Sequence, residues 1–104
     1  MKHFILFFFA ATLVCQGQII DFPDPNFKNA LLYHTPLIDT NGDGEIQVSE
    51  AEAQTYLHVF RKNISDLSGI EYFTNIQALR CYSNNLTQVD LSSNVELLYL
   101  EISE

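Results

Sequence analysis

The sequence contains little cysteine, little positive charge and no tryptophan. Its 104 residues include two cysteines, three prolines, four glycines and one methionine, and only five lysines and arginines stand against 13 acidic residues. The formal net charge of -8 argues against nucleic acid and anionic membranes as partners, because both need a basic face. The length allows one small domain. With 47% hydrophobic and 17% charged residues, the chain is too apolar to be disordered.

The first residues, MKHFILFFFAATLVCQGQII, have the layout of a secretory signal peptide. A lysine is followed by the apolar residues 4–14 and then by small residues at Cys15 and Gly17. The apolar run is too short to span a bilayer, which takes about 20 apolar residues. We expect cleavage after Gly17, so that residues 1–17 are removed, no transmembrane segment remains, and the protein is secreted or lies at the cell surface. A lipoprotein signal acylated on Cys15 is the alternative, but bulky Val14 stands where a small residue is needed.

Only one cysteine remains once the signal peptide is removed. Cys81 is then the single cysteine of the mature chain, and a single cysteine cannot form an internal disulfide. A mature chain this short buries little apolar surface, so its stability needs another source. Metal binding and the stacking of repeats are the two sources that we expect.

Residues 39–50, DTNGDGEIQVSE, fill every slot of the calcium-loop pattern D-x-[DN]-x-[DN]-G-x5-E. Calcium (Ca2+) takes roughly six to eight oxygen ligands, and such a loop supplies them from alternating side chains, one carbonyl and a final bidentate glutamate. Glycine at the sixth position permits the sharp turn. The predicted metal ligands are Asp39, Asn41, Asp43, the carbonyl of Glu45, Gln47 acting through water, and Glu50.

An ordinary acidic turn is the alternative interpretation of this loop, because Asp, Asn and Gly favour turns for local reasons. A turn alone does not require Glu50 at the last position or the apolar Ile46 at the eighth. No second loop of this kind is found in the sequence, whereas sensors and dockerins usually pair their loops. We therefore expect a structural calcium ion. A dockerin-like or sensor-type calcium-dependent docking module is the alternative function.

Helices are predicted on both sides of the loop. Asp24 is the predicted N-cap of the first helix, with Pro25 at its first position, and apolar residues follow at helical spacing. His34 lies on the same face, and we interpret it as a packed or partly exposed histidine and not as a ligand. After the loop, Ser49 and Glu52 have capping-box spacing, which predicts a helix that starts at Ser49.

The second half of the chain repeats itself with the spacing of leucine-rich repeats. Leu57 and Leu79 are 22 residues apart, and Leu79 and Leu100 are 21 apart, within the usual period of about 20–29 residues. The repeat pattern is formed by Ile76, Leu79, Cys81, Asn84 and Leu86. A β-meander with coincidental leucines is the alternative, but it does not explain the matched offsets.

The repeat spacing also predicts which side chains point into a shared core. Two inward rows are expected, one of Leu57, Leu79 and Leu100 and one of Val59, Cys81 and Ile102. Cys81 is then a small buried hydrophobe and not a reactive thiol. Asn84 is predicted to bond backbone groups of the bend where its strand ends.

From Gln18 onward the sequence resembles secreted bacterial leucine-rich repeat proteins that have internalin-like repeats behind an EF-hand or dockerin-like calcium loop. The segments FPDPNFKNALL, DTNGDGEI and NISDLSGIEYFTNI carry the resemblance. The expected fold class is α/β, a short leucine-rich repeat solenoid preceded by a small helical cap with an EF-hand-like calcium loop. The cap is expected over 18–54 and the repeats over 55–104. About two and a half repeats are present, so we expect a truncated product or a fragment, and Lys62 stands where the first repeat should have asparagine.

The predicted function is that of a secreted calcium-binding leucine-rich repeat protein that binds an extracellular protein or glycan, as an adhesion module does. Nucleic acid is not expected as a partner, and neither is enzyme activity, because G-x-S-x-G and H-E-x-x-H are both absent. Asn63 and Asn85, which begin glycosylation sequons, are interpreted as turn residues. The predicted ligand contacts are His58, Phe60, Arg80, Tyr82, Tyr99 and Glu101.

Overall fold

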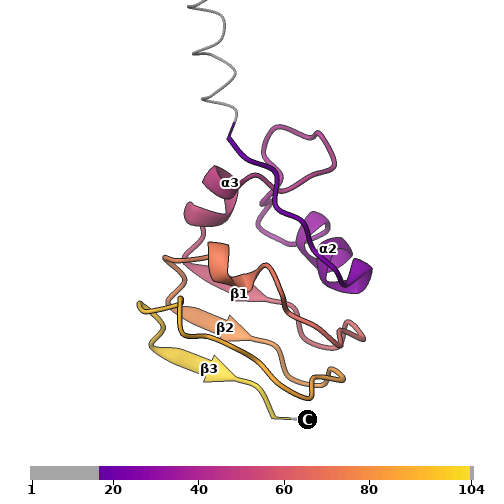
Figure 1. Cartoon of the computed structure of the whole chain (residues 1–104), viewed down its shortest axis with the longest axis vertical. Coiled ribbons are helices and arrows are strands. Elements are labelled where there is room, and N and C mark those ends of the chain that lie inside the picture. Colours follow the sequence, from indigo (N-terminus) through magenta and orange to yellow (C-terminus); the bar gives the residue numbers. More distant parts are fainter. Residues whose placement is uncertain (1–16, 104) are drawn as a thin grey trace, which may run out of the picture.

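The computed structural model describes residues 17–103, and the predicted signal peptide lies outside them except for its last residue, Gly17. The described residues form two short helices, one 3-10 helix and three strands. In chain order these are α2 (Pro25–Leu32), α3 (Val48–Glu52), β1 (Tyr56–His58), η1 (Ile70–Tyr72), β2 (Ala78–Arg80) and β3 (Tyr99–Glu101). Both helices lie at the β1 end of the molecule, and β2 and β3 follow below β1 in Figure 1.

The three strands form one parallel sheet in the order β1-β2-β3. Leu57 pairs with Leu79, and Leu79 pairs with Leu100, which confirms the predicted row. Side chains alternate between the two faces of a strand, so the residues on either side of each leucine point away from the core. Leu57 and Leu79 are fully buried, whereas Leu100 on the edge strand is 41% exposed.

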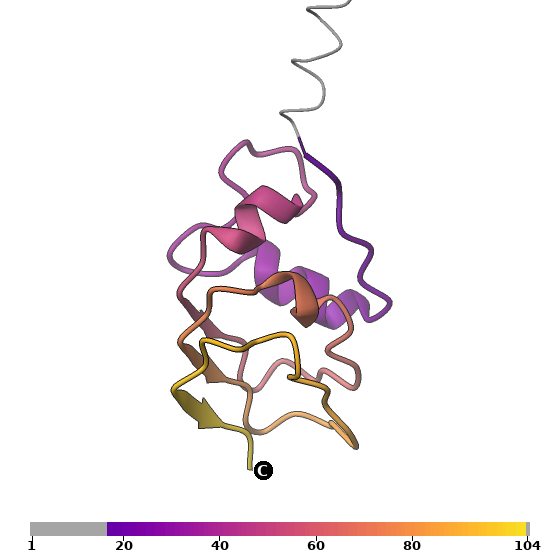
Figure 2. The same ribbon diagram turned by 60° about the vertical axis from the view of Figure 1, so that its left-hand side comes forward.

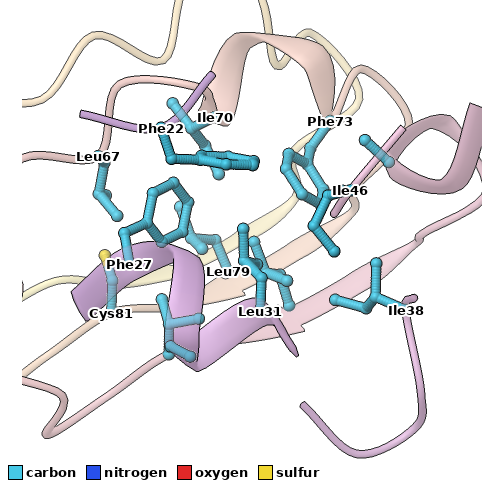
Figure 3. Packing of buried hydrophobic residues seen from close by; sticks show 14 of the residues in the cluster. Phe22, Phe27, Leu31, Ile38, Ile46, Leu67, Ile70, Phe73, Leu79 and Cys81 are labelled. Atoms are coloured by element: carbon cyan, nitrogen blue, oxygen red, sulfur yellow. The ribbon is translucent and has the colours of Figure 1, made fainter. Parts of the chain in front are cut away.

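One hydrophobic cluster joins the helices to the sheet. Phe27 and Leu31 of α2 belong to the same buried cluster as Leu79 and Cys81 of the sheet region, and Figure 3 shows these side chains converging from the two sides. Phe22 meets Phe27 edge to face, with their ring centroids 5.3 Å apart. The cluster therefore has contributions from the chain before and after the loop.

The expected fold class, a leucine-rich repeat solenoid preceded by a helical cap, is wrong. The described residues form a small three-stranded parallel sheet with few helices. In a solenoid each repeat contacts only its neighbours along one axis, but here Phe27 and Leu31 of α2 pack in the same core as Leu57 and Leu79. The helices are part of that core and not a separate cap on it. The boundaries 18–54 and 55–104 stay a prediction.

Asp24 fixes the start of α2, as predicted. Its Oδ1 accepts a hydrogen bond from the N–H of Asn26 at 2.9 Å, and Pro25 stands at the first helical position. Its Oδ2 accepts from the N–H groups of Ser65 and Asp66 at 2.7 and 3.0 Å. Burial acts to raise the pKa of this carboxyl, but the backbone donors outweigh burial, so the pKa of Asp24 lies below its usual value. One side chain thus caps α2 and ties it to the turn that follows β1.

The predicted start of α3 is wrong by one residue. The helix begins at Val48 with Gln47 as its N-cap, and Glu50 is its third residue. The Oε1 of Glu50 accepts a hydrogen bond from the N–H of Gln47 at 3.0 Å, which is the reciprocal bond of a capping box. The predicted capping box of Ser49 and Glu52 does not form, because Gln47 and Glu50 form the capping box of this helix.

Gly69 allows η1 to lie against the N-terminal segment. Its φ of +109° is in the left-handed region, and a Cβ at this position would collide with the ring of Phe22. Figure 2 shows η1 in the connection from β1 to β2, where it packs near α3. The chain can thus return to the sheet without displacing the aromatic core.

Candidate functional site

The first candidate site is the loop over residues 39–50, which joins α2 to α3. Glu50 closes it, because its Oε2 accepts from the N–H of Thr40 at 3.0 Å and its Oε1 from the N–H of Gln47. Ile46 is fully buried, and its carbonyl accepts from the N–H of Ile20 at 2.9 Å. The loop is therefore anchored at its end and at its eighth position.

Two aspartates hold the turns inside the loop. Asp39 accepts through Oδ2 from the N–H of Gly44 at 3.0 Å, and Asp43 accepts through Oδ1 from the N–H of Glu45 at 3.0 Å. That bond to Glu45 is the main reason why the pKa of Asp43 is lowered. The carboxylate of Glu45 turns away to Lys28, with 2.8 Å between Oε1 and Nζ. The carboxylate of Glu45 is thus engaged outside the loop, and the role of its carbonyl as a ligand stays a prediction.

Gln47 joins the remaining predicted ligands. Its Oε1 accepts from Nδ2 of Asn41 at 3.2 Å, and its Nε2 donates to Oδ2 of Asp43 at 2.5 Å. All six predicted ligand residues therefore lie in one hydrogen-bonded loop. Hydrogen bonds within the loop, and not converging carboxylates, hold these side chains in place.

Asp39 provides the observation that tests whether a cation fits. The residue is only 7% exposed, and its Oδ1 is buried without a hydrogen-bond partner. A buried carboxylate oxygen without a donor is unfavourable, and a hard cation would satisfy it. Across residues 17–103, however, no three His, Cys, Asp or Glu side chains lie close enough together to hold a metal. The donor chemistry fits calcium, whereas the carboxylates do not yet converge.

The second candidate site is the outward side of the strands, which we call the strand face. Its residues flank the buried leucine row, and a strand places alternate side chains on opposite sides. Tyr56 belongs to this face and was missing from the predicted contacts, although its position next to Leu57 could have identified it. The strand face consists of Tyr56, His58, Phe60, Arg80, Tyr82, Tyr99 and Glu101.

Arg80 lies at the centre of the strand face. Its Nε is 2.6 Å from Oε1 of Glu101, and Nη1 donates to the hydroxyl of Tyr56 at 3.4 Å. The guanidinium carbon lies 5.8 and 6.0 Å from the ring centroids of Phe60 and Tyr82, within the range of cation–π attraction. The bond to Glu101 raises the pKa of Arg80, and Arg80 in turn lowers the pKa of Glu101. Both groups stay charged near neutral pH.

Aromatic rings surround this arginine in a fixed arrangement. Phe60 and Tyr82 are stacked with centroids 4.8 Å apart and 10° between their planes. Tyr56 meets His58 edge to face at 5.0 Å, and His58 stacks on His34 at 4.4 Å. The strand face is therefore an ordered surface of half-exposed rings around one ion pair.

His34 lies beyond the end of α2 and closes the outer edge of β1. Its Nδ1–H donates to the carbonyl of Pro36 at 2.9 Å, and its Nε2 accepts from the N–H of His58 at 3.1 Å. The residue is 6% exposed, and burial is the main reason why its pKa is lowered. The prediction of a packed histidine is confirmed, and its two hydrogen bonds fix one neutral tautomer.

The chain resembles known proteins both in sequence and in structure. Over 73 residues the chain is 35% identical to Internalin J of Listeria monocytogenes serotype 4b (strain F2365), an alignment that covers 70% of this chain and 8% of that protein. The chain is similar to an internalin. No family model matches it. The predicted likeness to internalin-like bacterial proteins is thereby supported, and the comparison says nothing of the calcium loop.

Two solved structures share the fold. The CBM51-2 and INT domains of Clostridium perfringens ZmpB match with a TM-score of 0.68 and 22% identity, over 81% of this chain and 17% of that chain. The functional domain of InlJ from Listeria monocytogenes matches with a TM-score of 0.61 and 32% identity, over 78% and 18%. The chain thus spans less than a fifth of each of these proteins. Within residues 17–103, no helix is both long and apolar enough to cross a membrane.

Proposed function

We propose that this protein is a surface or secreted binding module that contacts an extracellular protein or glycan through the strand face. The observation that carries the proposal is the cluster of half-exposed rings around Arg80 and Glu101. Tyrosine, other aromatic residues and arginine are enriched at binding hot spots. The likeness to internalin J over 73 residues supports a binding role outside the cell.

The strand face suits recognition because little ordering remains to be done on binding. Arg80 is already held by Glu101 and Tyr56, and the rings of Phe60 and Tyr82 already stack. Immobilising a free side chain costs about 0.5–1.5 kcal/mol on association. A ligand that meets this surface avoids most of that cost.

An enzymatic role has no residues to carry it among those that we describe. Cys81 is buried and its pKa is raised to about 11, so it is not an activated nucleophile. His34 and His58 use ring nitrogens to hold backbone groups. The proposed module therefore binds its ligand without transforming it.

Binding is tested with the purified protein on a glycan array and, in parallel, on an array of extracellular proteins stripped of glycans. We expect signal on one array, and we expect Arg80→Ala and Tyr82→Ala to reduce it strongly. Thr87→Ala changes an exposed residue outside the strand face and serves as the matched control. If both strand-face variants bind as the wild type does, the ligand is held elsewhere.

We further propose that the loop over residues 39–50 binds one structural calcium ion. The buried Oδ1 of Asp39 that lacks a partner supports this proposal, as does the complete loop pattern. Glu50 would exchange its hydrogen bonds to Thr40 and Gln47 for coordination through both oxygens. The ion would then tie the end of α2 to the start of α3. A dockerin-like docking role is less favoured, because the sequence has one such loop.

Thermal unfolding with calcium or with a chelator tests this ion. At ten to a hundred times its dissociation constant, the ion adds about 1.4–2.7 kcal/mol to the free energy of unfolding, so the melting temperature should rise with calcium. Asp39→Ala and Glu50→Gln should abolish the rise, and magnesium should produce much less of it. Glu52→Gln removes the same charge from an exposed residue outside the loop and should leave the rise unchanged. An identical wild-type melt in calcium and chelator would show that the loop is only an acidic turn.

A further inference from the structure

The loop contains a step that is chemically unstable in its own right, Asn41 followed by Gly42. It is the one Asn-Gly pair in the sequence. In such a pair the backbone nitrogen of the second residue can attack the side-chain amide carbon of the first, and glycine has no Cβ to hinder the approach. Asparagine is among the thermolabile residues for this reason.

The surroundings of this step favour the attack. Both residues are exposed, and the space around Gly42 is open, since a Cβ there would meet nothing within 4 Å. The amide nitrogen of Gly42, which is the attacking atom, donates only a long hydrogen bond of 3.3 Å to the carbonyl of Asp39. Solvent can therefore reach both the backbone nitrogen of Gly42, which is the nucleophile, and the side-chain amide of Asn41.

The hydrogen bonds of Asn41 prepare its side chain as the electrophile. Its Oδ1 accepts from the N–H of Asp43 at 3.2 Å, and this bond draws electron density away from Cγ. Its Nδ2, the nitrogen that must leave, donates to Oε1 of Gln47 at 3.2 Å. The side chain is thus held with its carbonyl polarised.

We propose that Asn41 is a site of spontaneous deamidation in the folded protein. The Gly42 nitrogen loses its proton to solvent and bonds to Cγ of Asn41, and the Cγ–Nδ2 bond breaks. Ammonia leaves with a proton from water, and a five-membered succinimide remains. Water then opens one of the two imide C–N bonds and gives either aspartate or isoaspartate at position 41.

The two products have opposite consequences for the loop. Aspartate keeps the backbone path and satisfies the loop pattern, which accepts Asp or Asn at its third position. Isoaspartate routes the backbone through Cβ and Cγ, which lengthens it by one methylene group. That change disrupts the bond from the N–H of Asp43 to the side chain at position 41, and it moves the N–H of Gly44 away from Oδ2 of Asp39. The loop would lose its closure in proportion to the isoaspartate formed.

The other glycine step of the loop provides a contrast. Asp43 precedes Gly44, and the same cyclisation there would have to expel oxide or hydroxide from a carboxylate, which is a far poorer leaving group than ammonia. Both carboxylate oxygens of Asp43 also accept hydrogen bonds, from Glu45 and Gln47. The reaction is therefore assigned to position 41.

The test is an incubation of the full 104-residue protein at mildly alkaline pH in chelator, followed by proteolysis and mass spectrometry of the peptides. The peptide with Asn41 should gain the mass difference between an amide and an acid, and it should split into aspartate and isoaspartate forms. Asn85 is also exposed but precedes Leu86, so it serves as the internal control and should stay unconverted. Asn41→Asp should show no such mass gain at this peptide.

A second sample of the protein is incubated in denaturant for the same time, so that conversion in the folded and unfolded states can be compared. If Asn41 converts in denaturant while the folded protein shows no conversion over the same time, the fold protects the step and the proposal is overturned. The inference does not depend on the proposed calcium ion. Slower conversion in calcium would support that ion, and equal conversion would argue against the ion while the assignment of Asn41 stands.

Discussion

At the scale of single residues, His34 is under the tightest constraint. It is neutral, because its Nε2 must accept the N–H of His58 while its Nδ1–H donates to Pro36. A second proton on Nε2 would face that N–H and break the bond. The ring of His58 is stacked on it, and Lys62 contributes further positive charge. Burial is the largest cause that keeps the pKa of His34 low, and the charges of His58 and Lys62 add to it, against the bond to Pro36, which favours protonation.

This constraint predicts that the protein loses stability as the pH falls past 6.5. The pKa of His34 lies below the ordinary value of 6.5 in the folded protein, so below that pH the unfolded chain binds a proton that the folded protein refuses. The contribution of His34 to the free energy of unfolding is therefore fully present above pH 6.5 and is lost as the pH falls below it. Urea unfolding on both sides of this pH measures the decline. His34→Gln keeps an acceptor for the N–H of His58 without titrating, and it should flatten the decline.

The effect of His34 on stability can be separated from that of the carboxyl groups by its pH range. Aspartates with lowered pKa values, such as Asp24 and Asp66, also make stability fall in acid, but in a lower range of pH. Wild type and His34→Gln are therefore compared between neutral pH and the carboxyl range. Parallel curves there would mean that His34 is not the group responsible.

Cys81 should resist thiol reagents in the folded protein. It is 1% exposed, and burial raises its pKa to about 11, so both access and thiolate formation are suppressed. A maleimide should label it slowly in buffer and rapidly in denaturant. Native labelling as fast as that in denaturant would contradict its buried position next to the leucine row.

The loop pattern could be identified from sequence because its spacing is local, and hydrogen bonds hold its residues within one loop. The role of these residues as metal ligands stays a prediction. The tie from Asp24 to Ser65 and Asp66 could not be predicted in this way, since it joins positions 41 and 42 residues apart. The same holds for the stacking of His34 on His58. Residue types at such distances carry no spacing rule, because the fold alone decides where they meet.

At the scale of elements, Asn84 joins two successive turns of the chain. Its Oδ1 accepts from the N–H groups of Lys62 and Ile64, and its Nδ2 donates to the carbonyls of Val59 and Cys81. This confirms the prediction that its amide bonds the bend after its strand. The turn after β1 and the turn after β2 are thus held by the same side chain.

Replacing Asn84 with alanine should therefore destabilise the protein more than an exposed substitution does. The change leaves backbone donors and acceptors without partners, at a cost of about 1–3 kcal/mol for such groups. The neighbouring Asn85 is exposed, and its side-chain amide bonds only the side chain of Asn63. Asn85→Ala should change the free energy of unfolding by about 0.5 kcal/mol or less. Denaturant unfolding of both variants makes the comparison, and equal losses would remove Asn84 from this role.

The elements themselves were predictable in part. The N-cap at Asp24 and the pairing of Leu57, Leu79 and Leu100 follow from local and periodic signals. The start of α3 was misplaced because Glu50 satisfies two patterns at once, the end of the loop and the third position of a helix. In the structure Glu50 serves both, by bonding Thr40 and capping at Gln47. A sequence pattern cannot show that one side chain performs two tasks.

At the scale of the whole molecule, the sequence predicted the register of the sheet but not the architecture around it. Periodicity fixes which residues point inward, and it says nothing of what covers them. Phe27 and Leu31 come from a segment without the repeat, yet they pack in the same cluster as Leu79. That packing makes one small parallel sheet with its helices, where a cap and a solenoid had been expected.

The two edges of the sheet differ, and this difference predicts how the chain behaves at high concentration. The outer edge of β1 is covered, because His34 accepts the N–H of His58. Around β3, Leu98 is 84% exposed, and Leu100 and Ile102 are each 41% exposed. An exposed apolar edge strand invites pairing with another chain. Self-association is therefore expected to proceed through β3.

Sedimentation of a chain of residues 18–104 should accordingly show dimers or larger species at about tens of micromolar, the range in which weak edge contacts matter. Leu98→Lys places a charge on this edge and should shift the protein toward monomer. Leu37 is also exposed, at 59%, and lies before the loop, outside the strands. Leu37→Lys adds the same charge there and should leave association unchanged. A wild type that sediments as a monomer would show that the β3 edge does not pair at these concentrations. Equal dissociation by both lysine variants would show that the β3 edge is not the contact.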